Sequence, residues 1–105
     1  MTKQELVRTI SQETGVDQAM VLTTIEAFMD VTKRTMAGGE NIYLRGFGSI
    51  ILKKRAQKTA RNITKGETLV VPEHYIPSFK ACPEFMDMVA NAPVKEKVRA
   101  PKDQD

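Results

Sequence analysis

The part of the sequence that decides the fold is residues 45–71, which read RGFGSIILKKRAQKTARNITKGETLVV. This segment opens with a Gly-Phe-Gly turn and continues in a β-branched run from Ser49 to Leu52. It turns again at residues 62–66, where Asn and Gly stand at the two ends, and returns as a second strand at Glu67 to Val71. Between Lys53 and Pro72 neither strand alternates strongly between apolar and polar residues. Such a hairpin has little to bury, so we predict a two-stranded ribbon that projects from the body of the protein.

The positive charge of the chain is concentrated in this segment. The formal net charge is +3, yet residues 41–66 carry seven basic residues and no acidic one. Residues 1–40 sum to −2 and residues 67–92 to −3. A strongly basic block within an otherwise acidic chain indicates a surface for a polyanion. A solvated strand face is the alternative interpretation of such a charge run, and the ribbon shape favours the polyanion.

Two helices are predicted before the ribbon. Thr2 to Glu5 reads as a capping box that starts the first helix, and Gly15 is its stop signal. Asp17 is the expected N-cap of a longer helix that runs to about Ala37, before Gly38-Gly39. The apolar residues of this second helix extend beyond one face, so it must be covered on more than one side. In so short a chain a second copy would supply that cover, and we therefore expect a dimer.

The sequence signals for the elements before and after the ribbon are weaker. Residues 41–45 are strand-like, with Tyr43 on the face opposite to its apolar neighbours. Pro72 and Pro77 bracket the end of the second strand and confine it to an edge or to turns. Pro83 is the expected first residue of a short C-terminal helix. The last 13 residues contain seven charges, two prolines and no aromatic, so we expect a disordered tail.

The composition excludes several classes of protein. One cysteine, Cys82, cannot form an internal disulfide, and one histidine with one cysteine cannot make a zinc cage from those residues alone. No catalytic, metal or cofactor constellation is present, so no enzyme and no cofactor is expected. The longest apolar run, Ala19 to Leu22, is far below the roughly 20 residues of a membrane span, and the N-terminus lacks an export signal. We expect a cytoplasmic protein, with Cys82 a packed thiol and His74 a structural residue.

The order of the elements resembles the bacterial HU / integration host factor (IHF) family of histone-like DNA-bending proteins. The resemblance is ungapped from about residue 1 to residue 90 and rests on Gly46 to Ser49, Arg61-Asn62, Thr64 to Glu67, and Ile76 to Lys80. It implies an α+β, IHF-like DNA-binding fold: an intertwined dimer with a helical body, a β-saddle and two protruding β-ribbon arms that wrap the DNA minor groove.

The resemblance also implies a division of the chain. Residues 1–90 would form the DNA-binding domain, with the helical hairpin in 1–40, the saddle and arm in 41–80, and the C-terminal helix in 83–90. Residues 91–105 would be the disordered charged tail.

The residues that the resemblance implies for DNA binding lie mainly in the saddle and arm. Lysine and arginine there would neutralise phosphates and release counterions. The expected DNA-binding residues are Lys3, Arg45, Gly46, Ser49, Lys53, Arg55, Lys58, Arg61, Asn62, Ile63, Lys65 and Lys80. Arg45 resembles the IHF version of the turn, where it would reach the minor groove or a phosphate. The expected dimer-core residues are Phe28, Phe47 and Phe79.

The clearest departure from the family pattern is Ile63 at the arm tip. The family normally carries proline after the asparagine, and that ring wedges between base pairs. Isoleucine is also used as such a wedge in minor-groove binders, a group in which IHF and HU are standard examples. We therefore expect Ile63 to be the wedge, on a tip that lacks the fixed φ of proline. Pro83 stands where some relatives have lysine, which would remove one flank contact.

These observations predict a non-enzymatic, nucleoid-associated dimer that bends and compacts double-stranded DNA, including nicked, bent or junction DNA. Little sequence specificity is expected, because the minor-groove code is degenerate. Its protein partner would be a second copy or a paralogous subunit, and no membrane partner is expected. The first alternative is a sequence-preferring, IHF-like subunit of a heterodimer, which the Arg45 turn favours. The second is an interaction protein whose arms bind RNA or an acidic partner.

Overall fold

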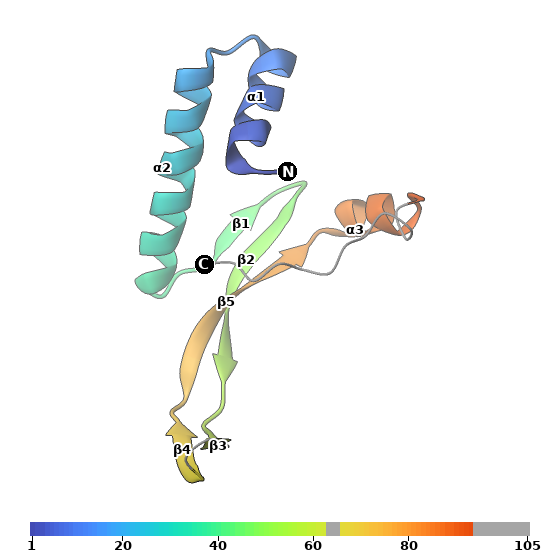
Figure 1. The fold of residues 1–105 in the computed structure, drawn as a ribbon. Coiled ribbons are helices and arrows are strands. Elements are labelled where there is room, and N and C mark those ends of the chain that lie inside the picture. The colour runs from blue at the N-terminus through green and yellow to red at the C-terminus, as the bar shows by residue number, and fades with distance from the viewer. Residues whose placement is uncertain (63–65, 94–105) are drawn as a thin grey trace. The chain divides into compact units, whose positions relative to one another are not determined.

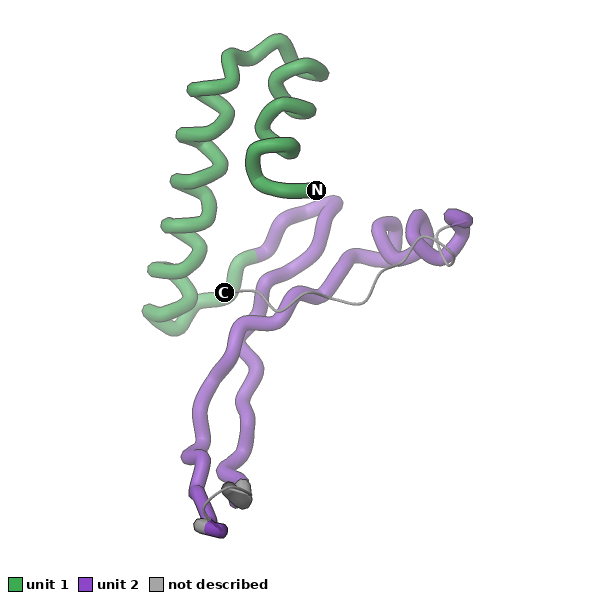
Figure 2. Tube along the Cα trace, viewed as in Figure 1, with its two compact units in different colours: residues 1–42 green, residues 43–105 purple. Residues whose placement is uncertain are grey.

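The computed structural model describes residues 1–62 and 66–93, and for residues 60–62 and 67 it describes the backbone alone. The chain divides into two compact units, Met1–Ile42 and Tyr43–Asp105 (Figure 2). Figure 1 labels the elements, which in chain order are α1 (Lys3–Thr14), α2 (Gln18–Ala37), β1 (Ile42–Leu44), β2 (Gly48–Arg55), β3 (Lys58–Asn62), β4 (Glu67–Val71), β5 (His74–Ala81) and α3 (Pro83–Ala90).

The helix ends of the first unit are set by their caps, as predicted. The Thr2 hydroxyl accepts a hydrogen bond of 3.2 Å from the Glu5 amide at the start of α1. Gly15 ends the helix in the left-handed conformation, with φ 77°. The Asp17 carboxylate accepts from the Ala19 amide at 3.1 Å and starts α2.

The two helices bury little apolar surface within one chain. Val7, Val21 and Met36 are the buried apolar side chains among the described residues. Large apolar side chains of α2 remain exposed, namely Met20, Phe28, Met29 and Val31. The apolar surface of α2 therefore does extend beyond the face that packs in a single copy.

The second unit contains two antiparallel ladders that form one ribbon. β2 pairs with β5 from Gly48↔Ala81 to Arg55↔His74, and β3 pairs with β4 from Lys58↔Val71 to Asn62↔Glu67. We call the break between the ladders, residues 56–57 and 72–73, the joint. Two residues on each side separate the ladders, so the register is the same before and after the joint. Proline lacks the N–H that a ladder needs, which accounts for a break at Pro72.

The predicted ribbon is confirmed, but its return strand differs from the expectation. Pro72 and Pro77 do not bracket the end of one strand, because β5 continues for eight residues beyond the joint. Pro77 lies inside β5, opposite Leu52. The three-stranded sheet has the order β1-β2-β5, so β5 is an edge strand. An edge strand is the place in a sheet that tolerates proline, as the sequence predicted.

The base of the ribbon is held by a small aromatic cluster. Phe47 in the turn lies 5.0 Å from Phe79 of β5 and 5.3 Å from Phe85 of α3, measured between ring centroids. The Cys82 amide donates a 3.0 Å hydrogen bond to the Phe47 carbonyl, which ties the start of α3 to the turn. The helix begins at Pro83 and ends at Ala90, as predicted.

Two further predictions concern the C-terminal tail and membrane-spanning helices. Residues 94–105, most of the predicted tail, lie outside the described residues. In the part of the chain that the structure describes, no helix has both the length and the apolar character needed to cross a membrane.

Candidate nucleic-acid interface

The register of β2 and β5 sorts their side chains onto two faces. Residues directly opposite each other in an antiparallel pair point to the same side, and successive residues alternate. One face, which we call the cationic face, carries Ser49, Ile51, Lys53, Arg55, His74, Ile76, Ser78 and Lys80. The other, which we call the apolar face, carries Gly48, Ile50, Leu52, Lys54, Tyr75, Pro77, Phe79 and Ala81.

The charges on the two faces differ. The cationic face carries Lys53, Arg55 and Lys80 and no acidic residue. The apolar face has one cation, Lys54, whose Nζ lies 3.0 Å from a carboxylate oxygen of Glu73 in the joint. Both partners are about half exposed, so this ion pair adds little stability. Its consequence is electrostatic, because it leaves the net positive charge of this ladder on the cationic face.

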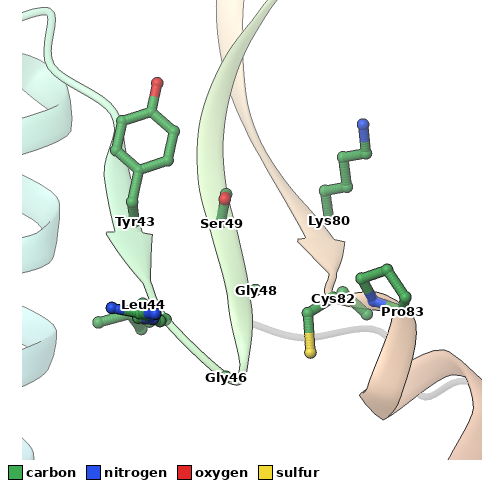
Figure 3. Close-up of a pocket in the computed structure, with 10 residues that line it drawn as sticks. Tyr43, Leu44, Gly46, Gly48, Ser49, Lys80, Cys82 and Pro83 are labelled. Atoms are coloured by element: carbon green, nitrogen blue, oxygen red, sulfur yellow. The ribbon is translucent and has the colours of Figure 1, made fainter.

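A first hollow lies where the ribbon meets the turn before β2. It has a volume of about 400 Å³. The side chains of Tyr43, Ser49 and Lys80 come from three neighbouring strands and extend toward the same side of the sheet (Figure 3). The remaining residues around it are Leu44, Arg45, Gly46, Gly48, Ala81, Cys82 and Pro83. An ammonium, a guanidinium and two hydroxyls at one place offer the hydrogen-bond donors that a phosphate accepts.

A second hollow, of about 510 Å³, lies at the joint. Arg55, Lys58 and His74 contribute its polar side chains. Its other lining residues, Ala56, Val71 and Ile76, are uncharged. Two cations and an imidazole, with no acidic residue among the described lining residues, make this hollow a second place suited to an anion.

The structure brings six of the predicted DNA-binding residues together at the two hollows. Arg45, Gly46, Ser49 and Lys80 line the first hollow, and Arg55 and Lys58 line the second. Lys53 is exposed on the cationic face, two residues before Arg55 in β2.

Other predicted residues are not brought to these hollows. Lys3 belongs to α1 in the first unit, and its Nζ is 2.9 Å from a carboxylate oxygen of Glu26 on α2. Arg61 and Asn62 belong to β3, where the backbone alone is described. Ile63 and Lys65 lie outside the described residues.

The predicted dimer-core residues are partly open to solvent in the single chain. Phe28 on α2 is 47% exposed, Phe47 is 48% exposed and Phe79 is 45% exposed. Phe47 and Phe79 pack on one side against each other and Phe85, which leaves their other sides uncovered.

Sequence reasoning missed Tyr43 and His74 as residues of the site. Tyr43 could have been found, because its strand pattern already placed it away from the apolar side chains of β1. His74 could not, because its pairing with Arg55 is a long-range property of the ladder. Among the described residues, no group of three or more His, Cys, Asp and Glu side chains could hold a metal ion.

Comparisons with known proteins agree with this geometry. The family described as "Bacterial DNA-binding protein" matches residues 1–90. Integration host factor subunit beta of Nitrosomonas europaea is 33% identical over 102 residues, which cover 93% of this chain and 94% of the relative. The same subunit of Hahella chejuensis is 36% identical over 96 residues, covering 90% and 97%. The Anabaena HU–DNA cocrystal structure has a TM-score of 0.82 and 26% identity, and covers 88% of this chain and 100% of that chain.

Proposed function

Because the chain belongs to the family of bacterial DNA-binding proteins that includes HU and integration host factor, we propose that it is a dimeric architectural protein that binds and bends double-stranded DNA. The observation that carries this proposal is the one-sided charge of the ribbon. Lys53, Arg55 and Lys80 share a face that has no acidic residue, and both hollows with cationic linings include residues of that face. A narrow ribbon with one cationic face fits a DNA groove between two phosphate backbones.

In the proposed mode of binding, phosphate contacts supply the affinity and an apolar wedge bends the DNA. The cations of the saddle and ribbon neutralise phosphates and carry most of the affinity, with little reading of the bases. Asn62 and Glu67 are the last pair of the ladder, and Ile63 follows Asn62 directly in the sequence. We assign Ile63 the role of the apolar wedge that unstacks a base step and kinks the duplex.

The second copy in the proposed dimer covers apolar surface that one chain leaves open. Phe28, Phe47 and Phe79 are each close to half exposed, and Met86 and Val89 of α3 are exposed further. Apolar side chains of this size normally find cover in a stable protein, because burying each one contributes about 1.5–3 kcal/mol. We therefore place Phe28, Phe47 and Phe79 in the dimer core.

The experiment that tests the proposed function is a titration of DNA duplex with the purified protein at several salt concentrations. If about eight phosphates are neutralised per dimer, the slope of log K against log salt is about −7. Linear, nicked and four-way-junction DNA are compared in the same series, and bent or kinkable DNA is expected to bind more tightly. A slope near zero, or no binding, would overturn the proposal.

The alternative of a heterodimer subunit has a specific observation behind it. Arg45 lines the first hollow together with Ser49 and Lys80, and a guanidinium that enters a narrow minor groove would give sequence preference. Two of the relatives named above are themselves subunits of integration host factor. The chain purified without any partner decides between the two: a homodimer that binds DNA favours the main proposal. Equal affinity for RNA and DNA duplexes would instead favour the RNA-binding alternative.

The remaining parts of the proposal concern the chain's organisation and location. We propose residues 1–90 as the DNA-binding domain, a range that the family match supports, with residues 91–105 as a charged tail. No catalytic role is proposed. The place of action is the cytoplasmic nucleoid, and a fluorescent fusion that fails to follow the DNA stain would argue against it.

A further inference from the structure

We infer that His74 is a DNA phosphate contact that becomes active on protonation, so that DNA binding by this protein takes up protons. This inference rests on the proposed function and adds a residue and a regulation to the same surface. The ligand is a backbone phosphate, and its place is the second hollow, at the joint of the ribbon. His74 is the one histidine of the chain.

The hydrogen bond of the His74 ring fixes which nitrogen carries the proton. Nδ1 lies 2.8 Å from the backbone carbonyl oxygen of Pro72. A carbonyl oxygen only accepts hydrogen bonds, so Nδ1 must be the donor in the neutral ring. Nε2 of the neutral ring then has a lone pair and no hydrogen, and it cannot donate to a phosphate. Protonation adds the Nε2 hydrogen and a positive charge while the bond to Pro72 is kept.

The side chains around the His74 ring favour the binding of an anion to the protonated ring. Arg55 of β2 is the register partner of His74 on the cationic face, and Lys58 of β3 lines the same hollow. Among the β4 side chains that the structure describes, Val71 lines the hollow. The nearby acid, Glu73 in the joint, is bound to Lys54 at 3.0 Å. An anion in the hollow would therefore meet two permanent cations and one that depends on pH.

The direction of the pH effect follows from linkage. A phosphate in the hollow favours the protonated ring, because it places a negative charge beside the imidazolium. A ligand that prefers the protonated protein binds more tightly as the proton concentration rises. Histidine changes its charge between about pH 5 and pH 8. DNA affinity is thus expected to rise as the pH falls through this range.

The test compares the protein with His74→Gln in DNA titrations at about pH 8 and about pH 5.5, on either side of the titration range of histidine. The glutamine amide is a neutral hydrogen-bond donor that does not titrate. The unchanged protein is expected to gain roughly tenfold in affinity at the lower pH, the effect of two exposed ion pairs per dimer. The slope of log K against log salt should steepen by about 2. His74→Gln should lack this gain between pH 8 and pH 5.5.

Lys33→Gln is the matched control, because Lys33 is an exposed cation of α2 and its replacement removes one positive charge outside the ribbon. It should keep the full gain at low pH. An equal gain in His74→Gln and in the unchanged protein would overturn the inference and leave the proposed function in place. Absence of DNA binding by all three proteins at both pH values would overturn the proposed function, and this inference with it.

Nuclear magnetic resonance of the His74 ring tests independently whether the ring contacts a phosphate. Since the chain has one histidine, its ring signals need no assignment by mutation. Adding DNA duplex at neutral pH should shift the ring signals toward those of imidazolium. If their position is the same in the free and the bound protein, His74 does not contact a phosphate and the inference is wrong.

Discussion

Gly48 lies so close to Phe79 that a Cβ atom on the glycine would stand 2.7 Å from Cζ and 2.8 Å from Cε1 of the ring. The same atom would stand 2.5 Å from the backbone carbonyl oxygen of Lys80. The two glycines of the turn therefore serve different purposes. Gly46 takes a positive φ of 85°, whereas Gly48 is required by space, because the Phe79 ring and the Lys80 carbonyl of the neighbouring strand β5 would meet a Cβ atom.

Gly48→Ala is expected to destabilise the protein by about 1–3 kcal/mol, because a backbone oxygen and a packed ring must move to admit one methyl group. Thermal unfolding followed by circular dichroism measures the effect. Gly38→Ala is the control, since Gly38 has an ordinary φ and its nearest atom would be 3.4 Å away. Equal unfolding temperatures for the two variants would contradict the close approach.

Removal of charge from the cationic face is expected to weaken DNA binding without unfolding the protein. Lys53→Gln combined with Arg55→Gln removes four phosphate contacts per dimer, so the salt slope should become shallower by about 4. Reversal of charge at Lys53, Arg55, Lys58 and Arg61 together should abolish binding. Exposed charges contribute little to stability, so the thermal transition should hardly change. An unchanged salt slope would show that the face does not meet the phosphates.

Glu26→Gln is expected to strengthen DNA binding by about two- to fivefold, because it releases the Lys3 ammonium from a partner that a phosphate must otherwise displace. Glu13→Gln, which removes the same charge from exposed surface of α1, is the matched control for net charge. A gain of the same size in both variants would mean that net charge alone is responsible. Stability should change by less than about 0.5 kcal/mol in either variant.

Ile63→Ala is expected to reduce the DNA bend measured by fluorescence transfer between the duplex ends. Its affinity for linear duplex should stay within about threefold, because the phosphate contacts remain. Ile63→Pro should keep or increase the bend, since it supplies the fixed φ of proline at the tip. The wedge assignment is wrong if Ile63→Ala destabilises the dimer and leaves the bend unchanged.

The dimer prediction is checked by sedimentation equilibrium. The mass in solution should be about twice the 11.8 kDa of one chain at tens of micromolar. Phe28→Asp should shift the equilibrium toward monomer, because it places a charge in the proposed core. A monomer in the unchanged protein would remove the support for Phe28, Phe47 and Phe79 as core residues.

Local signals in the sequence were sufficient for the helices. Caps act within a few residues of the helix end, so Thr2, Gly15 and Asp17 predicted the bounds of α1 and α2 closely. The sheet is different, because its register depends on which residues meet across the ribbon. Such distant partners determine three features of the ribbon: the continuation of β5 through Pro77, the joint, and the pairing of Arg55 with His74. For the same reason the sequence predicted which cations are in the ribbon but not which of them share a face.

The unchanged register across the joint also restricts which deletions evolution can tolerate in the ribbon. The links Ala56-Gln57 and Pro72-Glu73 have equal lengths, so β3 and β4 meet in the same alignment as β2 and β5. One codon lost from either link would shift the outer ladder by a residue and turn its side chains to the opposite side. A second codon lost from the facing link would restore the alignment in a shorter ribbon. A change of length at the joint that keeps this register therefore takes one residue from each strand.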